Sequence, residues 1–207
     1  MKQSLKNRQS AFSLVELMIS ITILAVLMGV ALPSFQNMLL NTQIRNAAGT
    51  VLEGIQRARA EAVKQNRYIE FVLLGNDANC DNPATPVSET CASWRVQWVG
   101  GGGGNNALLP TTDINNPIVA MMSNEGSHDV KRTTVPAGSN TITFDSTGSR
   151  VSPNDAGALG GPTPITSIAF DSTILNPADS HDLQIVISVG GAARICDPNV
   201  STGPYKC

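Results

Sequence analysis

An apolar segment near the amino terminus, with one acidic residue inside it, most constrains this chain. The segment reads AFSLVELMISITILAVLMGVALP, and Glu16 is its single charged residue. From Leu17 to Ile44 there is no Asp, Glu, Lys or Arg. About 20 apolar residues span a bilayer, so residues 12–32 are long enough to do so. A lone carboxylate there costs about 2.5–3.5 kcal/mol on insertion scales, so Glu16 marks a function and needs a partner.

A short basic head precedes this segment. Residues 1–11, MKQSLKNRQSA, contain Lys2, Lys6 and Arg8 and no acidic residue. Basic residues beside a membrane segment stay cytoplasmic, so we expect the rest of the chain to be exported. The net charge of −2 and the 4% aromatic content argue against general nucleic-acid binding.

Two ordinary interpretations explain part of this pattern. A cleaved secretory signal ending in GVA at Ala31 would leave Leu32 as the first residue. A plain transmembrane anchor explains the length of the segment. Neither explains Glu16.

The segment AFSLVEL resembles the processing site of type IV prepilins and pseudopilins. In that family a short basic leader and a small residue precede Phe, and Glu is the fifth residue of the mature chain. The resemblance implies cleavage between Ala11 and Phe12 by a prepilin peptidase, followed by methylation of the new amino group on Phe12. The family usually has Gly before the cut, and we expect the small Ala11 to permit processing. Pro33 occupies the place of a proline common in pilin helices.

The same resemblance supplies a partner for Glu16. The methylated amine of Phe12 stays cationic, so Glu16 of an entering subunit can pair with the Phe12 amine of its neighbour in a filament. The free-energy cost of an unpaired carboxylate in the membrane would then favour recruitment of the subunit into the filament, where Glu16 is paired.

One helix is expected from about Phe12 to Gln65. In its second half a stripe of apolar residues recurs at spacings of three and four, which predicts packing on a globular domain. Arg57 and Glu61 are spaced for an i,i+4 ion pair. Gly29 and Pro33 mark an expected bend. The stripe comprises Ile44, Ala48, Val51, Ile55, Ala58 and Ala62.

The run TQIRNAAGTVLEGIQRARAEAVKQNRYIEFVL resembles the GspH/FimT group of minor pilins and pseudopilins, closest to its FimT/FimU branch. This implies an α+β fold, with a long amino-terminal helix packed on an antiparallel β-sheet or β-sandwich head. We expect a cleaved leader (1–11), a membrane or filament-core half-helix (12–33), an amphipathic half-helix (34–66) and a head (67–207).

Short β-like runs separated by turn clusters follow the helix. Alternation is clear in RVQW and TITF, as expected for half-buried antiparallel strands. The expected strands are residues 67–74, 93–99, 116–122, 140–145, 166–170 and 183–189.

Four cysteines fit an exported, oxidising destination. Cys80 with Cys91 and Cys196 with Cys207 are each eleven positions apart. We expect two local disulfides worth roughly 2–3 kcal/mol each. Four cysteines allow three pairings, so a crossed arrangement stays open.

No catalytic, metal or cofactor site is predicted. The run Gly100–Gly104 lacks the Lys-Ser/Thr of a P-loop, and His128 and His181 lie in polar turns without a nucleophile elbow. Asp145 and Asp171 follow strands, where Asp commonly caps a turn.

Binding of DNA is the alternative from another class. Some FimT-like members act in natural transformation through a basic carboxyl-terminal patch with a Gly-Arg-x-Arg motif. Here the comparable segment, VGGAARICDPN, has one Arg, so the motif is broken. Phosphate contacts would be weak and salt-sensitive. The candidate contacts are Lys131, Arg132, Arg150 and Arg194.

The resemblance implies a non-enzymatic minor pilin that helps prime a type IV pilus, in its tip complex. A type II secretion pseudopilin is the alternative within the class. The implied partners are other minor pilins, the major pilin, the prepilin peptidase and the inner-membrane assembly platform. The chain would cross the bacterial inner membrane once, with its head in the periplasm before incorporation into a surface pilus or pseudopilus.

The mature amino terminus separates these interpretations. We expect mass spectrometry of the chain purified from its own cells to find amino-methylated Phe12. A first residue of Leu32 would instead identify an ordinary secretory signal, and an intact Met1 would identify an unprocessed anchor.

Overall fold

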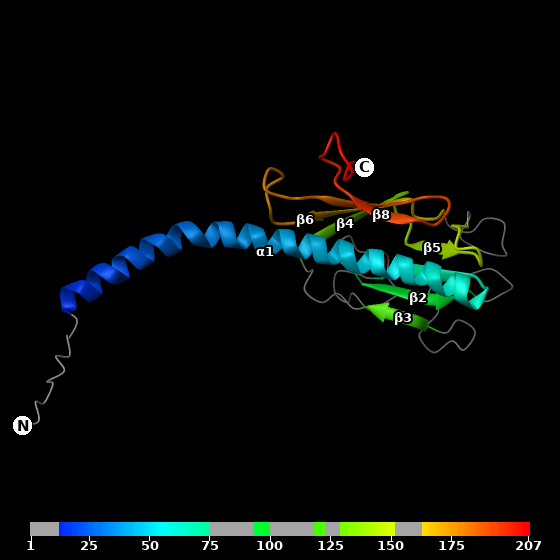
Figure 1. The fold of residues 1–207 in the computed structure, drawn as a ribbon, viewed down its shortest axis with the longest axis horizontal. Helices are drawn as coiled ribbons and strands as arrows, with labels where there is room; N and C mark the ends of the chain where they lie inside the picture. The colour runs from blue at the N-terminus through cyan, green and yellow to red at the C-terminus, as the bar shows by residue number, and fades with distance from the viewer. Residues whose placement is uncertain (1–12, 75–92, 100–117, 123–128, 152–162) are drawn as a thin grey trace, which may run out of the picture. The chain divides into compact units, whose positions relative to one another are not determined.

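The computed structural model describes residues 13–74, 93–99, 118–122, 129–151 and 163–207, apart from the side chains of residues 30–33. The chain divides into two compact units, Met1–Met38 and Leu39–Cys207. Within the described residues, the element order is one long helix followed by eight strands, an α+β arrangement as predicted (Figure 1).

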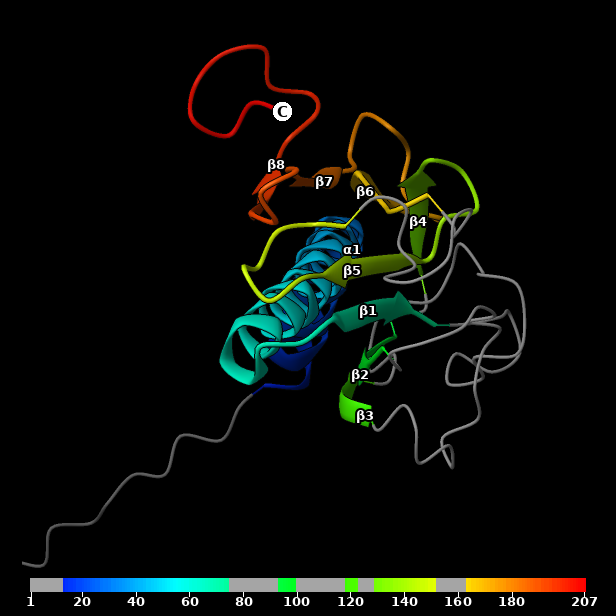
Figure 2. The same cartoon turned by 90° about the vertical axis from the view of Figure 1, so that its right-hand side faces the viewer.

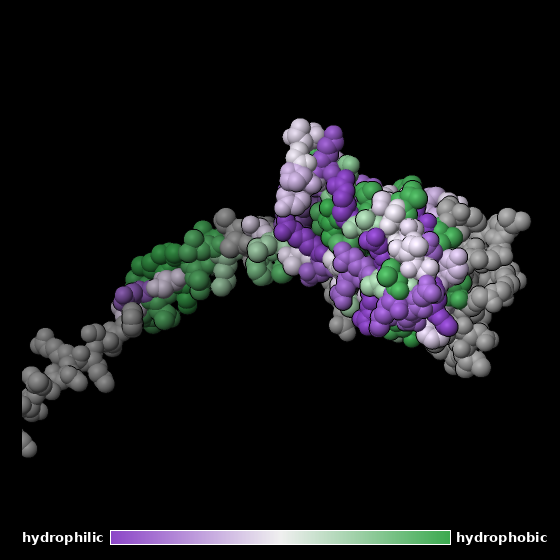
Figure 3. Space-filling view, turned by 45° about the vertical axis from the view of Figure 1, so that its right-hand side comes forward, coloured by the Kyte–Doolittle hydropathy of each residue, from purple (hydrophilic) through white to green (hydrophobic). Residues whose placement is uncertain are grey.

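Helix α1 runs from Leu14 to Gln65 and matches the expected helix closely. By length and composition its amino-terminal half can cross a membrane, and an 18-residue window there has a mean hydropathy of 2.4. The apolar side chains of this half are exposed, and Figure 3 shows them as a hydrophobic surface. The backbone stays helical through Gly29 and Pro33, and a bend there stays a prediction.

The carboxyl-terminal half of α1 is amphipathic. All six residues of the predicted stripe are 0% exposed, so that prediction is confirmed. The predicted Arg57–Glu61 ion pair is wrong, because the Glu61 carboxylate contacts Lys64 Nζ at 3.2 Å and accepts a hydrogen bond from Gln65 at 2.7 Å.

The carboxyl end of α1 is closed by a left-handed residue. Asn66 adopts a left-handed conformation, with φ of 52°, which a short polar side chain tolerates. The N–H of Arg67 then donates to the carbonyl of Ala62 at 3.2 Å. This reversal sends the chain directly into the first strand.

The strands form two antiparallel sheets of four, ordered β3-β2-β1-β5 and β4-β6-β7-β8. Figure 2 shows both sheets beside the part of α1 in the second unit, residues 39–65, which is called the docked half below. The bounds are β1 Ile69–Leu73, β2 Trp94–Trp98, β3 Ile118–Met122, β4 Val130–Val135, β5 Thr141–Phe144, β6 Ser167–Ser172, β7 Leu183–Ile187 and β8 Ala193–Cys196.

All six expected strands are present, and two further strands, β4 and β8, were not predicted from the sequence. The burial of β4 alternates strictly, but an arginine, Arg132, occupies one of its inward positions. That arginine hid the alternation, because a buried strand position is ordinarily apolar. The four residues of β8, ARIC, do not alternate fully between apolar and polar, unlike TITF of the equally short β5.

One hydrophobic core joins the helix to both sheets. The inward residues of β1, β2 and β5 meet the helix stripe from one sheet, and those of β6 and β7 meet it from the other. The largest fully buried side chains in this core include Trp94, Phe71, Phe144 and Phe170.

Gly54 marks the closest approach of the helix to a sheet. A Cβ built there would lie 2.6 Å from Trp94 Cδ2 and 2.8 Å from Phe71 Cε2. The Phe71 and Trp94 rings themselves pack with centroids 6.1 Å apart. A glycine at this position therefore lets the helix reach the indole.

We expect Gly54→Ala to destabilise the head even though Ala is the better helix former. The clash should cost about 1–3 kcal/mol, which exceeds the ~1 kcal/mol that Ala gains in a helix. Gly49→Ala is the matched control, because a Cβ there meets nothing within 4 Å. Thermal unfolding of the detergent-solubilised chain should show a lower midpoint for Gly54→Ala and an equal or higher one for Gly49→Ala. Equal effects would contradict this packing argument.

Candidate functional site

Glu16 lies in the first turn of α1 and is exposed. Ser13 precedes the helix, and its carbonyl accepts a hydrogen bond from the N–H of Leu17 at 3.2 Å. The Ser13-x-x-Glu16 spacing is that of a capping box, and a carboxylate also suits the positive end of the helix dipole. The sequence from residue 13 to Ile44 contains no cation. A charge partner for Glu16 must therefore come from outside this segment.

Asn41 fastens the docked half of α1 to the loop between β6 and β7. Its Nδ2 donates to the carbonyl of Asp179 at 3.0 Å, and its Oδ1 accepts from the N–H of His181 at 2.8 Å. One side chain thus satisfies a backbone acceptor and a backbone donor of the same loop.

Arg59 makes the corresponding contacts near the other end of the docked half. Its Nε donates to the carbonyl of Gly148 at 3.0 Å, and its Nη2 donates to that of Gly190 at 3.2 Å. Gly191 has φ of 76°, and a Cβ there would lie 2.0 Å from the Gly148 oxygen. Arg59 therefore ties together the loop after β5 and the β7–β8 turn where the two backbones touch.

Neither Asn41 nor Arg59 was predicted from the sequence as a functional residue. The position of Arg59 could have been predicted to be partly buried, because it lies four residues after Ile55 and three before Ala62, both on the buried stripe. A charged side chain on the packed face of a helix needs hydrogen-bond acceptors from the loops that face it.

Arg132 was expected to be a surface residue that could contact DNA, and the structure contradicts this expectation. It is 2% exposed, and its guanidinium donates to the carbonyls of Leu74 and Ser93. Burial lowers its pKa to about 9, which leaves it charged at neutral pH. Arg132 thus joins the end of β1 and the start of β2 to the second sheet, and it presents no surface to a phosphate.

The other three candidates do not form one patch. Lys131 lies on β4 opposite Asp171. Arg194 lies on β8 at the other edge of that sheet, three strand spacings or ~14 Å across, and in the row of Val135, four residues along β4 from Lys131. Arg150 is half-buried, with Nη1 donating to the carbonyl of Ile165 at 3.1 Å.

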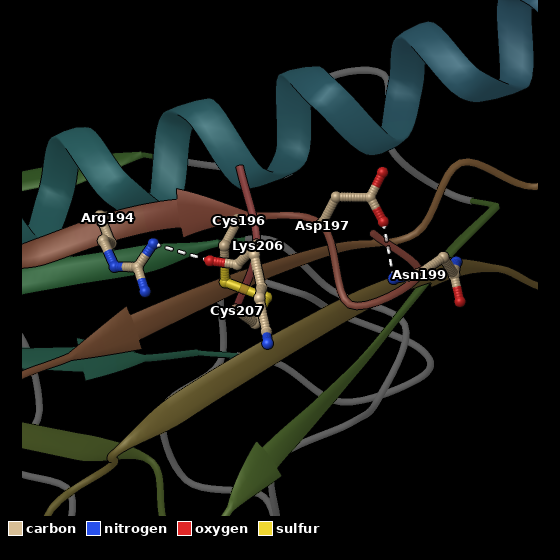
Figure 4. Close-up of a disulfide and its surroundings, with 6 residues drawn as sticks. All are labelled: Arg194, Cys196, Asp197, Asn199, Lys206 and Cys207. Carbon is tan, nitrogen blue, oxygen red and sulfur yellow. Dashed lines mark hydrogen bonds between the residues drawn. A yellow bond between two sulfur atoms is a disulfide. The ribbon is translucent and has the colours of Figure 1, made fainter. Parts of the chain in front are cut away.

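A disulfide joins Cys196 to Cys207, one of the two local pairings expected. Figure 4 shows it beside Arg194, whose Nη1 donates to the carbonyl of Lys206 at 3.0 Å. The N–H of Asp197 donates to the carbonyl of Tyr205 at 2.7 Å. The last eleven residues are therefore folded back on the end of β8. Cys80 and Cys91 lie outside the described residues, as do Ala11, Phe12, His128 and the run 100–104.

The aspartates serve local structure. The Asp145 carboxylate accepts from the backbone N–H groups of Thr147 and Ser149, as expected for a turn. Burial acts to raise the pKa of Asp145, but these hydrogen bonds outweigh it and lower that pKa. Burial, with nearby Asp171, raises the pKa of Asp182. Within the described ranges no three His, Cys, Asp or Glu residues are placed to hold a metal ion.

We expect Arg59→Ala to destabilise the head by about 1–3 kcal/mol, because two backbone carbonyls lose a charged donor. Arg57→Ala is the matched control, since Arg57 is exposed and lies on another face of α1, two residues before Arg59. Urea unfolding of the detergent-solubilised chain should show a lower midpoint for Arg59→Ala alone. An equal shift in both variants would contradict a specific role for Arg59.

Two family models match this chain. The prokaryotic N-terminal methylation motif matches residues 6–32, which include Ala11, Phe12 and Glu16. The family of type II transport protein GspH matches residues 47–191. No curated protein sequence matches the chain.

Crystal structures of the type IV minor pilin FimU from Pseudomonas aeruginosa are similar to this chain. The crystal form in space group P21 is 18% identical and covers 80% of this chain and 96% of FimU, with a TM-score of 0.46. The P65 form is 17% identical, covers 79% and 98%, and has a TM-score of 0.45.

The GspH match extends over more than half of the chain and includes α1 from residue 47 onward and strands β1 to β7. Together with the methylation motif, it confirms the family predicted from the sequence. The chain belongs to the GspH/FimT family of pilin-type proteins.

Proposed function

We propose that this protein is a minor pilin that helps prime assembly of a type IV pilus and is incorporated in its tip complex. The observation that carries the proposal is the division of α1. An exposed apolar half with one acidic residue, Glu16, continues into a half whose stripe is fully buried in the head. Such a helix suits a subunit that leaves a membrane and enters a filament core while its head stays folded.

The proposed sequence of events begins at the amino terminus. A prepilin peptidase cuts between Ala11 and Phe12, and the new amine is methylated. Glu16 then pairs with the Phe12 amine of a neighbouring subunit, which offsets the cost of a carboxylate among apolar side chains. Pro33 allows α1 to bend as it enters the filament. The head faces the periplasm, and the other pilins and the inner-membrane assembly platform are the partners.

A pseudopilin of a type II secretion system is the second candidate. The description of the matched family, type II transport protein GspH, favours it. Both machines require the same amino terminus, so the helix supports either. DNA binding has less support, because Arg132 is buried and Lys131 and Arg194 lie at opposite edges of a sheet.

Complementation of a gene deletion tests the proposal. We expect the deletion to lose surface pili and retain exoprotein release, and wild type to restore the pili. Glu16→Gln should be processed to methyl-Phe12 yet lower pilus yield at least about tenfold, because it lacks the charge. Gln keeps the capping-box position, so this variant separates pairing from capping. Glu53→Gln, an exposed acid on the docked half, is the matched control and should behave as wild type.

Other outcomes assign other roles. Normal piliation by Glu16→Gln with loss in Glu16→Ala would make Glu16 a cap and refute the pairing. Intact pili with exoproteins held in the periplasm of the deletion strain would assign the chain to type II secretion. Retention of both would leave DNA uptake as the function to measure.

A further inference from the structure

Strand β8 lies at an edge of its sheet beside the docked half of α1 (Figure 2). It pairs with β7 on one side, with Val186 opposite Arg194 and Ile187 opposite Ala193. The backbone groups on its other side decide whether this edge accepts another strand.

The hydrogen-bond pattern identifies those groups. The N–H of Ser188 donates to the carbonyl of Ala192 at 2.9 Å. In an antiparallel ladder the bonded pairs recur every second residue, so Arg194 and Cys196 are the next to bond β7. The N–H and C=O groups of Ala193 and Ile195 therefore point away from the sheet.

The tail of the chain occupies part of this edge. The next outward residue, Asp197, donates its N–H to the carbonyl of Tyr205 and pairs with Lys206 in a parallel bridge. The Cys196–Cys207 disulfide holds this contact. In the part of the chain that the structure describes, nothing pairs with the outward groups of Ala193 and Ile195.

A groove of about 560 Å³ lies beside the start of β8. Alanines 60, 192 and 193 and the half-exposed Val63 supply apolar surface. Two cations, Arg59 and Lys64, line the groove and no acidic residue does; Lys64 also contacts Glu61 outside it. The groove lining is thus apolar and positively charged next to open backbone groups.

We propose that the β8 edge and this groove dock an extended, acidic segment of another protein as an added strand. The segment bonds the backbone of Ala193 and Ile195, and its carboxylate lies near Arg59 and Lys64. In strand addition, main-chain hydrogen bonds supply affinity and side-chain contacts supply specificity. Here the specific contact is that of one carboxylate of the docked segment with the cations of the groove. This docking goes beyond the proposed priming role and depends on the head alone.

The charges argue for another protein rather than a second copy. The edge strands of the two described sheets are β3, β4, β5 and β8, and none of them contains Asp or Glu. Pairing between two such edges would bring no carboxylate of a paired edge strand to the groove that Arg59 and Lys64 line.

Site-specific photo-crosslinking tests the docking in cells that make the full chain naturally. The photoreactive probe p-benzoylphenylalanine replaces Ala192, which is exposed and lines the groove. The same probe at Thr133, exposed on β4, is the positional control. We expect crosslinks from position 192 that mass spectrometry maps to an extended segment of another protein, within a few residues of an Asp or Glu.

Two second-site variants in the probe-bearing chain test the contacts. Ala193→Pro removes an outward N–H and should lower the crosslink yield at least about fivefold. Lys64→Glu reverses a groove charge and should also lower it, whereas Lys131→Glu, the same change on β4, should not. Lys64→Glu keeps the test decisive if Ala193→Pro lowers the melting temperature.

Several results would overturn the proposal. These are crosslinks to a helix or a basic segment, to a second copy of this chain, or equally from position 133. A yield unaffected by Lys64→Glu, or the absence of any crosslink from position 192, would do the same. Docking is scored by these yields and priming by the Glu16 variants, so failure of one is distinguishable from failure of the other.

Discussion

Burial of one face of α1 between two sheets is the interaction on which the rest of the head depends. Six stripe residues are 0% exposed, and they meet inward residues from both sheets in one core. Neither sheet has another partner for its inner face among the described elements. Removal of the docked half-helix would therefore expose the cores of both sheets, since a sheet with an apolar face must bury it against another element. Gly54 shows how close this packing is.

Hydrogen bonds from polar side chains add to the hydrophobic packing of α1 in the head. Asn41 and Arg59 each bond the backbone of loops that connect the strands, one near each end of the docked half. Hydrophobic burial is non-directional, whereas these hydrogen bonds set the rotation and axial position of the helix. Arg132 acts similarly between the sheets. A subunit that must enter an assembly by its helix benefits from a head that holds the helix in one position.

The elements that the sequence predicted well have strong local patterns. The stripe from Ile44 to Ala62, the end of the helix near Gln65 and six strands follow from periodicity and turn residues. Strand β4 was missed because Arg132 occupies an inward position, and β8 because its four residues, ARIC, do not alternate fully between apolar and polar. Arg132 itself was expected on the surface, because nothing local to DVKRTT reveals that the carbonyls of Leu74 and Ser93 lie above it. The partners of Asn41 and Arg59 are 89 to 140 residues away in the chain.

The sequence by itself determined the family and the amino-terminal methylation motif. The basic head, Ala11, Phe12, Glu16 and the apolar run are contiguous, so a linear sequence pattern is sufficient to recognise them. Tertiary structure alone decided which charged side chains are available. It buries Arg132, directs Nε and Nη2 of Arg59 to two carbonyls, separates Lys131 from Arg194 and leaves one edge of β8 open beside a basic groove. The physical reason is that burial and hydrogen-bond pairing depend on neighbours that are distant in sequence, and these meet only when the sheets close around the helix.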